Sequence, residues 1–142
     1  MTSFSEVMLR GLLLPVLLLA GAARAELVLV GHPGLRVEAL PQGVVSRIFL
    51  GQSERLPDGT PTQVLHEKQN QSRFYAEVLG RDPAQVEKYW ARAIFSGRVK
   101  PPREVPAAAL KGVIAATPGA LAYMERSEVD ASVRIIRIET DR

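Results

Sequence analysis

The run LVLV, Leu27–Val30, constrains the fold most, because all four of its residues are apolar. A strand with one solvated face alternates apolar and polar residues, so an unbroken apolar run predicts a strand that is buried on both faces. Such strands occur in parallel or mixed sheets that helices cover on both sides. The sequence GHPG, residues 31–34, then ends the run. We therefore expect a compact domain with three layers, of the α/β or α+β class.

Short helices and strands are predicted along the rest of the chain. Apolar residues at helical spacing predict a helix over residues 41–50 that ends at Gly51. A second helix is closed by Gly80, and either Asn70 or Ser72 is placed to cap its start. In total we expect about four short strands, at residues 27–30, 62–66, 120–124 and 132–139, and about four helices, at residues 41–50, within 67–80, at 83–96 and at 107–116.

The helix over residues 83–96 has the strongest boundary signals. Asp82 is a favourable N-cap, Pro83 suits the first helical position, and Gln85 stands at the capping-box position. The apolar residues of this helix fall on one face; they are Val86, Tyr89, Trp90, Ala93 and Ile94. From this spacing we expect Trp90 to be buried in a single hydrophobic core.

Residues 1–25 have the layout of a cleavable signal peptide. Arg10 precedes the apolar run GLLLPVLLLAGA, and the sequence ARA at residues 23–25 supplies small residues two positions apart. The apolar run is shorter than the about 20 residues that a bilayer core requires. We expect cleavage after Ala25, a domain at residues 26–142 and a periplasmic location.

The sequence contains no cysteine. Because a bacterial lipoprotein needs a cysteine at its processing site, we expect no lipid anchor. An exported chain without cysteine also forms no disulfides, so its hydrophobic core has to supply the stability.

The charge is low and scattered. The predicted signal peptide holds one acid and two bases, so its removal lowers the formal net charge by one from +3. No run of basic residues occurs, which argues against nucleic acid as a partner. The densest group of bases is Arg98, Lys100 and Arg103, interleaved with two prolines. This group is either a solvated loop or a surface for an acidic partner.

No residue pattern points to catalysis or to a metal. His32 and His66 are the only histidines, and neither stands at a spacing used by metal ligands, so we expect surface or structural roles for both. No serine, cysteine or threonine stands in a known nucleophile motif. We expect a protein that is not an enzyme, with no metal and no cofactor.

Four pieces of sequence occur in the order found in one known family. They are IFLGQSERLPDGTP at residues 48–61, SRFYAEVLGRDPAQVEKYW at 72–90, IFSGRVKPP at 94–102 and ATPGALAYM at 116–124. Together they resemble the phosphate-binding, type 2 periplasmic solute-binding proteins of ABC transporters. The resemblance covers nearly all of residues 26–142, and it implies a non-catalytic, single-lobe member with one α/β lobe of the periplasmic-binding-protein fold.

The resemblance also implies a place for a ligand. Family members hold phosphate between two lobes, with Ser-Gly-Thr at a helix N-terminus; this chain has length for about one lobe and has QNQS, residues 69–72, at that point. Ala122 stands where the family usually has glycine. The predicted ligand-binding residues are Asn70, Gln71, Ser72 and Arg73. Free N–H groups, the helix dipole and a guanidinium favour phosphate or a similar small oxyanion there. Since a ligand held from one side stays hydrated, we expect weak binding, on the order of millimolar.

Two functions remain open from the sequence. The first is a solute-binding protein that works with a membrane transporter. The second is a single-lobe interaction module that binds no small ligand and instead binds an envelope protein partner. A homodimer that rebuilds the cleft from two copies would combine the two.

Overall fold

The computed structural model describes residues 26–140, so the predicted signal peptide at residues 1–25 lies outside the described residues. In chain order the elements are β1 (Leu27–Gly31), β2 (Ala39–Pro41), α1 (Gln42–Phe49), β3 (Gln63–His66), α2 (Gln71–Arg73), the π-helix η1 (Phe74–Val78), α3 (Pro83–Phe95), β4 (Arg103–Glu104), α4 (Ala107–Ala116), β5 (Ala120–Glu125), the 3-10 helix η2 (Arg126–Glu128) and β6 (Arg134–Glu139). Within these residues no helix is both long and apolar enough to cross a bilayer.

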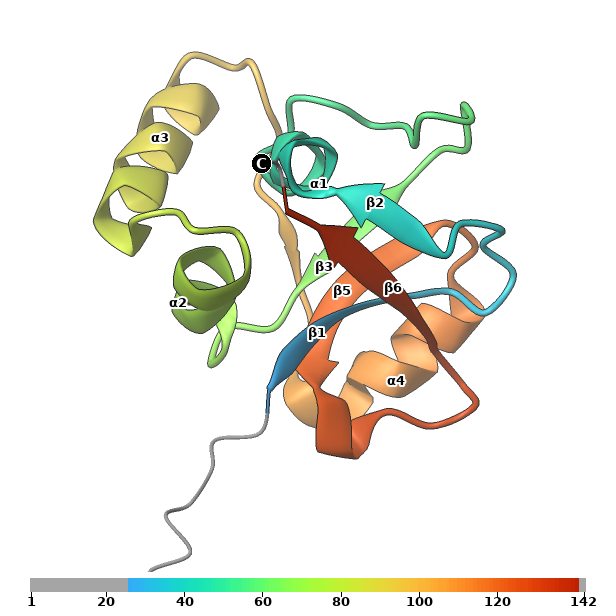
Figure 1. Ribbon diagram of the computed structural model, residues 1–142. Coiled ribbons are helices and arrows are strands. Elements are labelled where there is room, and N and C mark those ends of the chain that lie inside the picture. Colours follow the sequence, from blue (N-terminus) through green and yellow to red (C-terminus); the bar gives the residue numbers. More distant parts are fainter. Residues whose placement is uncertain (1–25, 141–142) are drawn as a thin grey trace, which may run out of the picture.

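The strands form one mixed, six-stranded sheet with the order β2-β6-β1-β5-β3-β4 (Figure 1). β1 pairs antiparallel with both β5 and β6. The pairs β2–β6, β3–β5 and β3–β4 are parallel. The central β1 is buried along its whole length, as the LVLV run predicts.

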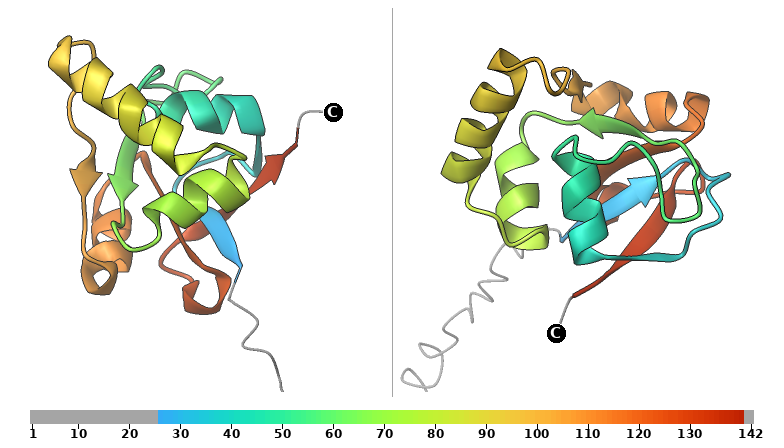
Figure 2. Two further views of the ribbon diagram at one scale, coloured as in Figure 1. Left: turned by 90° about the vertical axis from the view of Figure 1, so that its left-hand side faces the viewer. Right: turned by 90° about the horizontal axis from the view of Figure 1, so that it is seen from above.

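The sheet separates two hydrophobic clusters, which confirms the predicted three layers (Figure 2). Leu27 and Leu29 belong to the larger cluster, which α1, η1 and α3 cover. Val28 and Val30 belong to the smaller cluster, which α4 covers. The expectation of a single core is therefore wrong, because a doubly covered strand sends alternate side chains into two separate clusters.

Two of the six strands were not predicted. β2 is only three residues long and ends in a proline. β4 comprises two residues within the proline-rich segment that follows α3. Both are edge strands whose pairing comes from the neighbouring backbone, and strands this short leave no periodic pattern in the sequence.

The segment after β3 begins as α-helix and continues as π-helix. The Leu79 amide donates to the Phe74 carbonyl oxygen at 3.1 Å, a bond between residues five apart. Phe74 and Tyr75 are consecutive and both buried. Neither predicted residue caps this helix, because the side chain of Asn70, at the N-cap position, makes no capping bond and Ser72 lies inside α2.

α3 begins as predicted, since the Asp82 side chain accepts a hydrogen bond from the Ala84 amide at 2.9 Å. Its inward face is less covered than the spacing indicates. Within α3 only Val86 and Ala93 are fully buried, Trp90 is half-buried at the edge of the larger cluster, and Ile94 is 40% exposed. The prediction that Trp90 is buried in the core is therefore wrong. α3 lies at the rim of the molecule (Figure 2). Its apolar stripe extends past the part of the core that covers it, as the exposure of Ile94 shows.

Glycines permit two of the tight turns. Gly51 has a φ of +72° at the end of α1, which confirms it as the helix stop. Gly119 has a φ of +80° before β5, and a Cβ there would lie 2.3 Å from the carbonyl oxygen of Pro61. Only glycine fits that backbone approach.

Candidate functional site

The turn between β3 and α2 is where the resemblance places an oxyanion. In the structure, the backbone amides of this turn donate hydrogen bonds to a carboxylate of the chain itself. The Oε1 atom of Glu67 accepts a hydrogen bond from the Gln69 amide at 2.8 Å. Its Oε2 atom accepts one from the Asn70 amide at 2.9 Å. The residue is buried, with 4% exposure. A bound phosphate would have to compete with this carboxylate for the same N–H groups.

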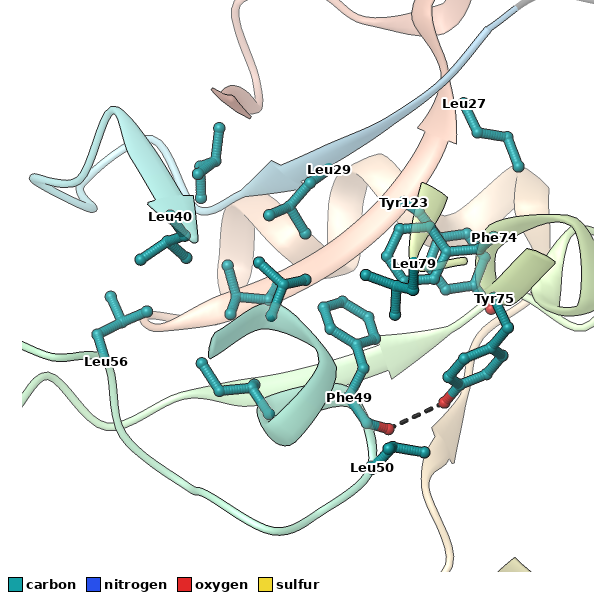
Figure 3. Close-up of a cluster of buried hydrophobic side chains, with 14 of the residues drawn as sticks. Leu27, Leu29, Leu40, Phe49, Leu50, Leu56, Phe74, Tyr75, Leu79 and Tyr123 are labelled. Carbon is teal, nitrogen blue, oxygen red and sulfur yellow. Dashed lines mark hydrogen bonds between the residues drawn. The ribbon is translucent and has the colours of Figure 1, made fainter. Parts of the chain in front are cut away.

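The hydrophobic core holds Glu67 in place. The Tyr123 hydroxyl donates to the Glu67 carbonyl oxygen at 3.0 Å. The ring of Tyr123 stacks on Phe74 with a centroid distance of 4.3 Å and an interplanar angle of 12° (Figure 3). Burial raises the pKa of Tyr123, so the hydroxyl keeps its proton and stays a donor. The turn is thus fixed from β5 and from η1 at once.

His66, directly before Glu67, is fully buried and adds to this network. Its Nδ1 atom lies 3.2 Å from the Tyr123 hydroxyl. Because the Tyr123 proton goes to the Glu67 carbonyl, Nδ1 carries the His66 proton and donates to Tyr123. Burial lowers the pKa of His66 to about 4, so the ring is neutral at pH 7. The structure therefore gives this histidine a structural role inside the core.

Arg73, the predicted cation of the site, points back into the protein. Its NH1 atom lies 3.2 Å from the Asn70 Oδ1 atom and 3.3 Å from the Glu125 Oε1 atom on β5. Its NH2 atom lies 3.5 Å from the Glu77 Oε2 atom, one helical turn further along. The guanidinium charge is balanced within the chain by these contacts.

The hollow beside this turn, which we term the acidic hollow, has a volume of about 610 Å³. Its charged lining consists of four carboxylates, Glu67, Glu125, Glu128 and Asp130, and one ammonium group, Lys111. Lys111 lies 3.0 Å from the Asp130 Oδ2 atom. Hydrogen bonds from Ser132, together with Lys111, lower the pKa of Asp130 to about 2, so this carboxylate is ionised at pH 7. The net charge of the lining disfavours an anion.

The four predicted ligand-binding residues do not converge on one hollow. Asn70 lines the acidic hollow. Gln71 and Ser72 line a different one, against α3 and Trp90. Arg73 is engaged by Glu77 and Glu125 as described.

Two charged features were missed in part by sequence reasoning. Glu67 was not among the predicted site residues, although an acid shortly before a helix start is a signal for an amide-capping carboxylate. The carboxylates that join it come from β5, η2 and the following turn, which only the fold brings together. In residues 26–140 no group of three or more histidine, cysteine, aspartate or glutamate side chains is placed to hold a metal.

No protein-family model and no curated protein matches the sequence. Solved structures match the fold. A protein from Clostridium perfringens, described as a phosphate ABC transporter substrate-binding protein with bound phosphate, aligns with a TM-score of 0.61 at 16% identity, over 80% of this chain and 45% of that chain. An ABC-type phosphate transport receptor from Vibrio cholerae aligns with a TM-score of 0.56 at 15% identity, over 83% and 48%. A possible phosphate-binding protein from Planctomyces limnophilus aligns with a TM-score of 0.58 at 11% identity, over 82% and 42%.

These likenesses define the class of fold: an α/β lobe of the periplasmic-binding-protein type. More particularly, the chain resembles in fold a part of each of these three structures, whose descriptions all name phosphate, as the four pieces of sequence predict. The chain spans less than half the length of each of these structures.

Proposed function

We propose that this protein is a non-catalytic, extracytoplasmic protein whose periplasmic-binding-protein-like lobe is an interaction module for an envelope protein partner. One observation carries the proposal: the Glu67 carboxylate accepts hydrogen bonds from the Gln69 and Asn70 amides at 2.8 and 2.9 Å. An oxyanion at this turn would displace a buried carboxylate from two charge-assisted hydrogen bonds. It would also enter a hollow lined by three more carboxylates. The lobe keeps the fold of a phosphate receptor while its own side chain replaces the ligand.

Calorimetric titration with phosphate and with sulfate tests this proposal. The wild-type protein should give no saturable heat below about 1 mM ligand, which corresponds to less than about 4 kcal/mol of binding free energy. Glu67→Ala frees the two amides and removes one negative charge, so phosphate binding should tighten by about tenfold or more.

Glu128→Ala is the matched control, because Glu128 lines the same hollow and is exposed but accepts no bond from the turn amides. It should change phosphate affinity by less than about threefold, in keeping with a solvent-screened charge. Micromolar phosphate binding by the wild-type protein would contradict the proposed function.

A second candidate is weak binding of phosphate or a similar oxyanion at Asn70, Gln71, Ser72 and Arg73, in a protein that serves a membrane transporter. One observation favours it: the Clostridium perfringens structure, which this chain resembles in fold, carries phosphate. The expected affinity is on the order of millimolar. Loss of that binding in the double variant Ser72→Ala with Arg73→Ala would support this candidate.

The partner could also be a second copy of this chain, which would form a homodimer. Sedimentation velocity of the purified protein over a concentration series distinguishes a homodimer from a monomer.

We further propose export, with a domain at residues 26–142 after cleavage at Ala25. Mass spectrometry of a periplasmic extract tests this. A mature N-terminus other than Glu26 would contradict the cleavage site.

A further inference from the structure

α3 leaves much of its apolar stripe without cover. Of its thirteen residues, only Val86 and Ala93 are buried, and Ile94 on the same stripe is 40% exposed. Phe95 lies off this stripe, on the outer face of the helix, and is 94% exposed. The helix lies at the outer edge of the molecule in both views of Figure 2. The phenyl ring of Phe95 is free of contacts with the core and is accessible to another molecule.

Basic side chains surround this end of α3. A hollow of about 850 Å³ between α3 and the turn after α1 is lined by Lys88, Arg92 and Arg98 and by no carboxylate. A second hollow, of about 520 Å³, shares Gly51, Arg98 and Val99 with the first, so the two are neighbours. We term them together the basic groove. Its cations are Lys88, Arg92, Arg98, Lys100 and Arg103, and its one carboxylate is Glu54.

These five cations form no ion pair within residues 26–140; the ion pairs there involve Arg73, Lys111, Arg126, Arg134 and Arg137 instead. Lys88 and Arg92 are four residues apart, so they share a face of α3, where like charges destabilise a helix. Clustered cations that lack internal partners create a positive potential that attracts an anionic partner.

The shape of the groove favours a peptide over a single small anion. Two neighbouring hollows offer several separate positive positions, whereas one oxyanion can engage only a few donors. Trp90 lines the second hollow, and Pro101 and Pro102 form part of its wall. Aromatic and proline surfaces of this kind bind apolar side chains of a peptide, while arginine binds carboxylates in a bidentate manner. A flat membrane would meet Phe95 but would not fill a concave groove.

We propose that the basic groove binds an acidic, extended segment of a protein partner, with carboxylates against Arg92, Arg98 and Lys100 and an apolar residue beside Phe95. This inference rests on the proposed function, because it assigns the surface and the chemistry of the partner to the interaction module.

Fluorescence anisotropy with a fluorescein-labelled peptide of four Glu-Glu-Leu repeats tests the inference. The wild-type protein should bind this probe at least about tenfold more tightly than the charge-reversed peptide of Lys-Lys-Leu repeats, and binding should weaken as salt increases. The double variant Arg92→Glu with Arg98→Glu should weaken binding by about tenfold or more. Phe95→Ser should weaken it by about threefold or more.

The matched control is Arg36→Glu with Arg81→Glu, two exposed bases outside the groove. It carries the same change in net charge and should retain binding within about threefold. Equal weakening by both double variants would overturn the inference, because it would show a general charge effect. The absence of wild-type binding to the acidic peptide at low salt would overturn it as well.

Vesicles containing phosphatidylglycerol provide the competing outcome. Binding to vesicles that Phe95→Ser abolishes, without binding to the peptide, would replace the peptide by a lipid surface. The phosphate titration above stays separate from these results. If the peptide does not bind and phosphate does not bind either, the groove assignment fails while the proposed function stands. If phosphate binds at micromolar concentration, the proposed function fails whether or not the peptide binds.

Discussion

The acidic hollow and the basic groove differ in how their charges are satisfied. In the acidic hollow Glu67 accepts two amide bonds, Glu125 pairs with Arg73, and Asp130 pairs with Lys111. In the basic groove none of the five cations forms an ion pair with a described residue. The chain itself therefore satisfies most of the charge at the turn where an anion was expected, whereas unpaired positive charge collects on α3 and the segment after it.

The largest contrast in stability should come from two phenylalanines. Phe74 is fully buried against Tyr123, under the turn that holds Glu67, so Phe74→Ala should lower the free energy of unfolding by about 3–5 kcal/mol. Phe95, beside the basic groove, is 94% exposed, and Phe95→Ala should change it by less than about 0.5 kcal/mol. Urea unfolding followed by circular dichroism measures both. Similar losses for the two variants would mean that α3 packs more tightly than described.

Acid should lower the free energy of unfolding through His66, the residue next to Glu67. An unfolded histidine binds a proton below about pH 6.5, whereas buried His66 stays neutral until about pH 4. The unfolded state therefore binds more protons in this window, and stability should fall by up to about 3 kcal/mol as the pH drops from 6.5 to 4. Urea unfolding across this range tests the sign and size.

Substitutions of the two histidines test whether His66 causes the expected fall in stability at acid pH. His66→Gln should reduce the loss of stability between pH 6.5 and 4. His32→Gln, in the turn after β1, is the control for replacing a histidine outside the core. A wild-type stability that stays level over the window would contradict the buried, neutral His66.

Removing the Glu67 carboxylate should lower the free energy of unfolding by less than removing the Phe74 ring beneath the turn. Glu67→Ala leaves the Gln69 and Asn70 amides without their partner, and the expected loss is about 2 kcal/mol of unfolding free energy. Glu67→Gln retains one acceptor oxygen and should lose about half as much. Thermal unfolding of the two variants measures the difference. A variant Glu67→Ala as stable as the wild type would show that water replaces the carboxylate at no cost.

The smallest effect should have the opposite sign. Arg92→Ala removes a like-charge contact with Lys88 on α3, so it should leave stability unchanged or raise it by about 0.2–0.5 kcal/mol. The expected gain should shrink at high salt, because salt screens exposed charges. A clear loss of stability would show that Arg92 has a stabilising contact, and it would weaken the contrast between the two regions.

Local signals predicted much of the fold, and tertiary contacts decided the rest. The cap of α3 at Asp82 and the stop of α1 at Gly51 were predictable because each rests on a few neighbouring residues. The exposure of Ile94 was not, because helical spacing defines a face but not how far the covering core extends. The two-residue β4 forms only because the end of β3 lies next to it.

The turn at residues 69–73 could be predicted from the sequence, but the charged side chains around it could not. The resemblance located the turn at residues 69–73, and the fold places that turn between β3 and α2. Its charge was not predictable, since Glu125, Glu128 and Asp130 lie far from Glu67 in sequence and meet it only in the acidic hollow. The basic group at Arg98, Lys100 and Arg103 was visible in sequence, but its continuation through Lys88 and Arg92 required the position of α3.

The most direct test of the central claim is a phosphate titration followed by ¹H–¹⁵N correlation NMR at the Gln69 and Asn70 amides. If Glu67 occupies these N–H groups, their resonances should not shift saturably with phosphate below about 1 mM. In Glu67→Ala the same two resonances should shift saturably, since the amides are then free. Saturable shifts of both amides at micromolar phosphate in the wild-type protein would contradict the account.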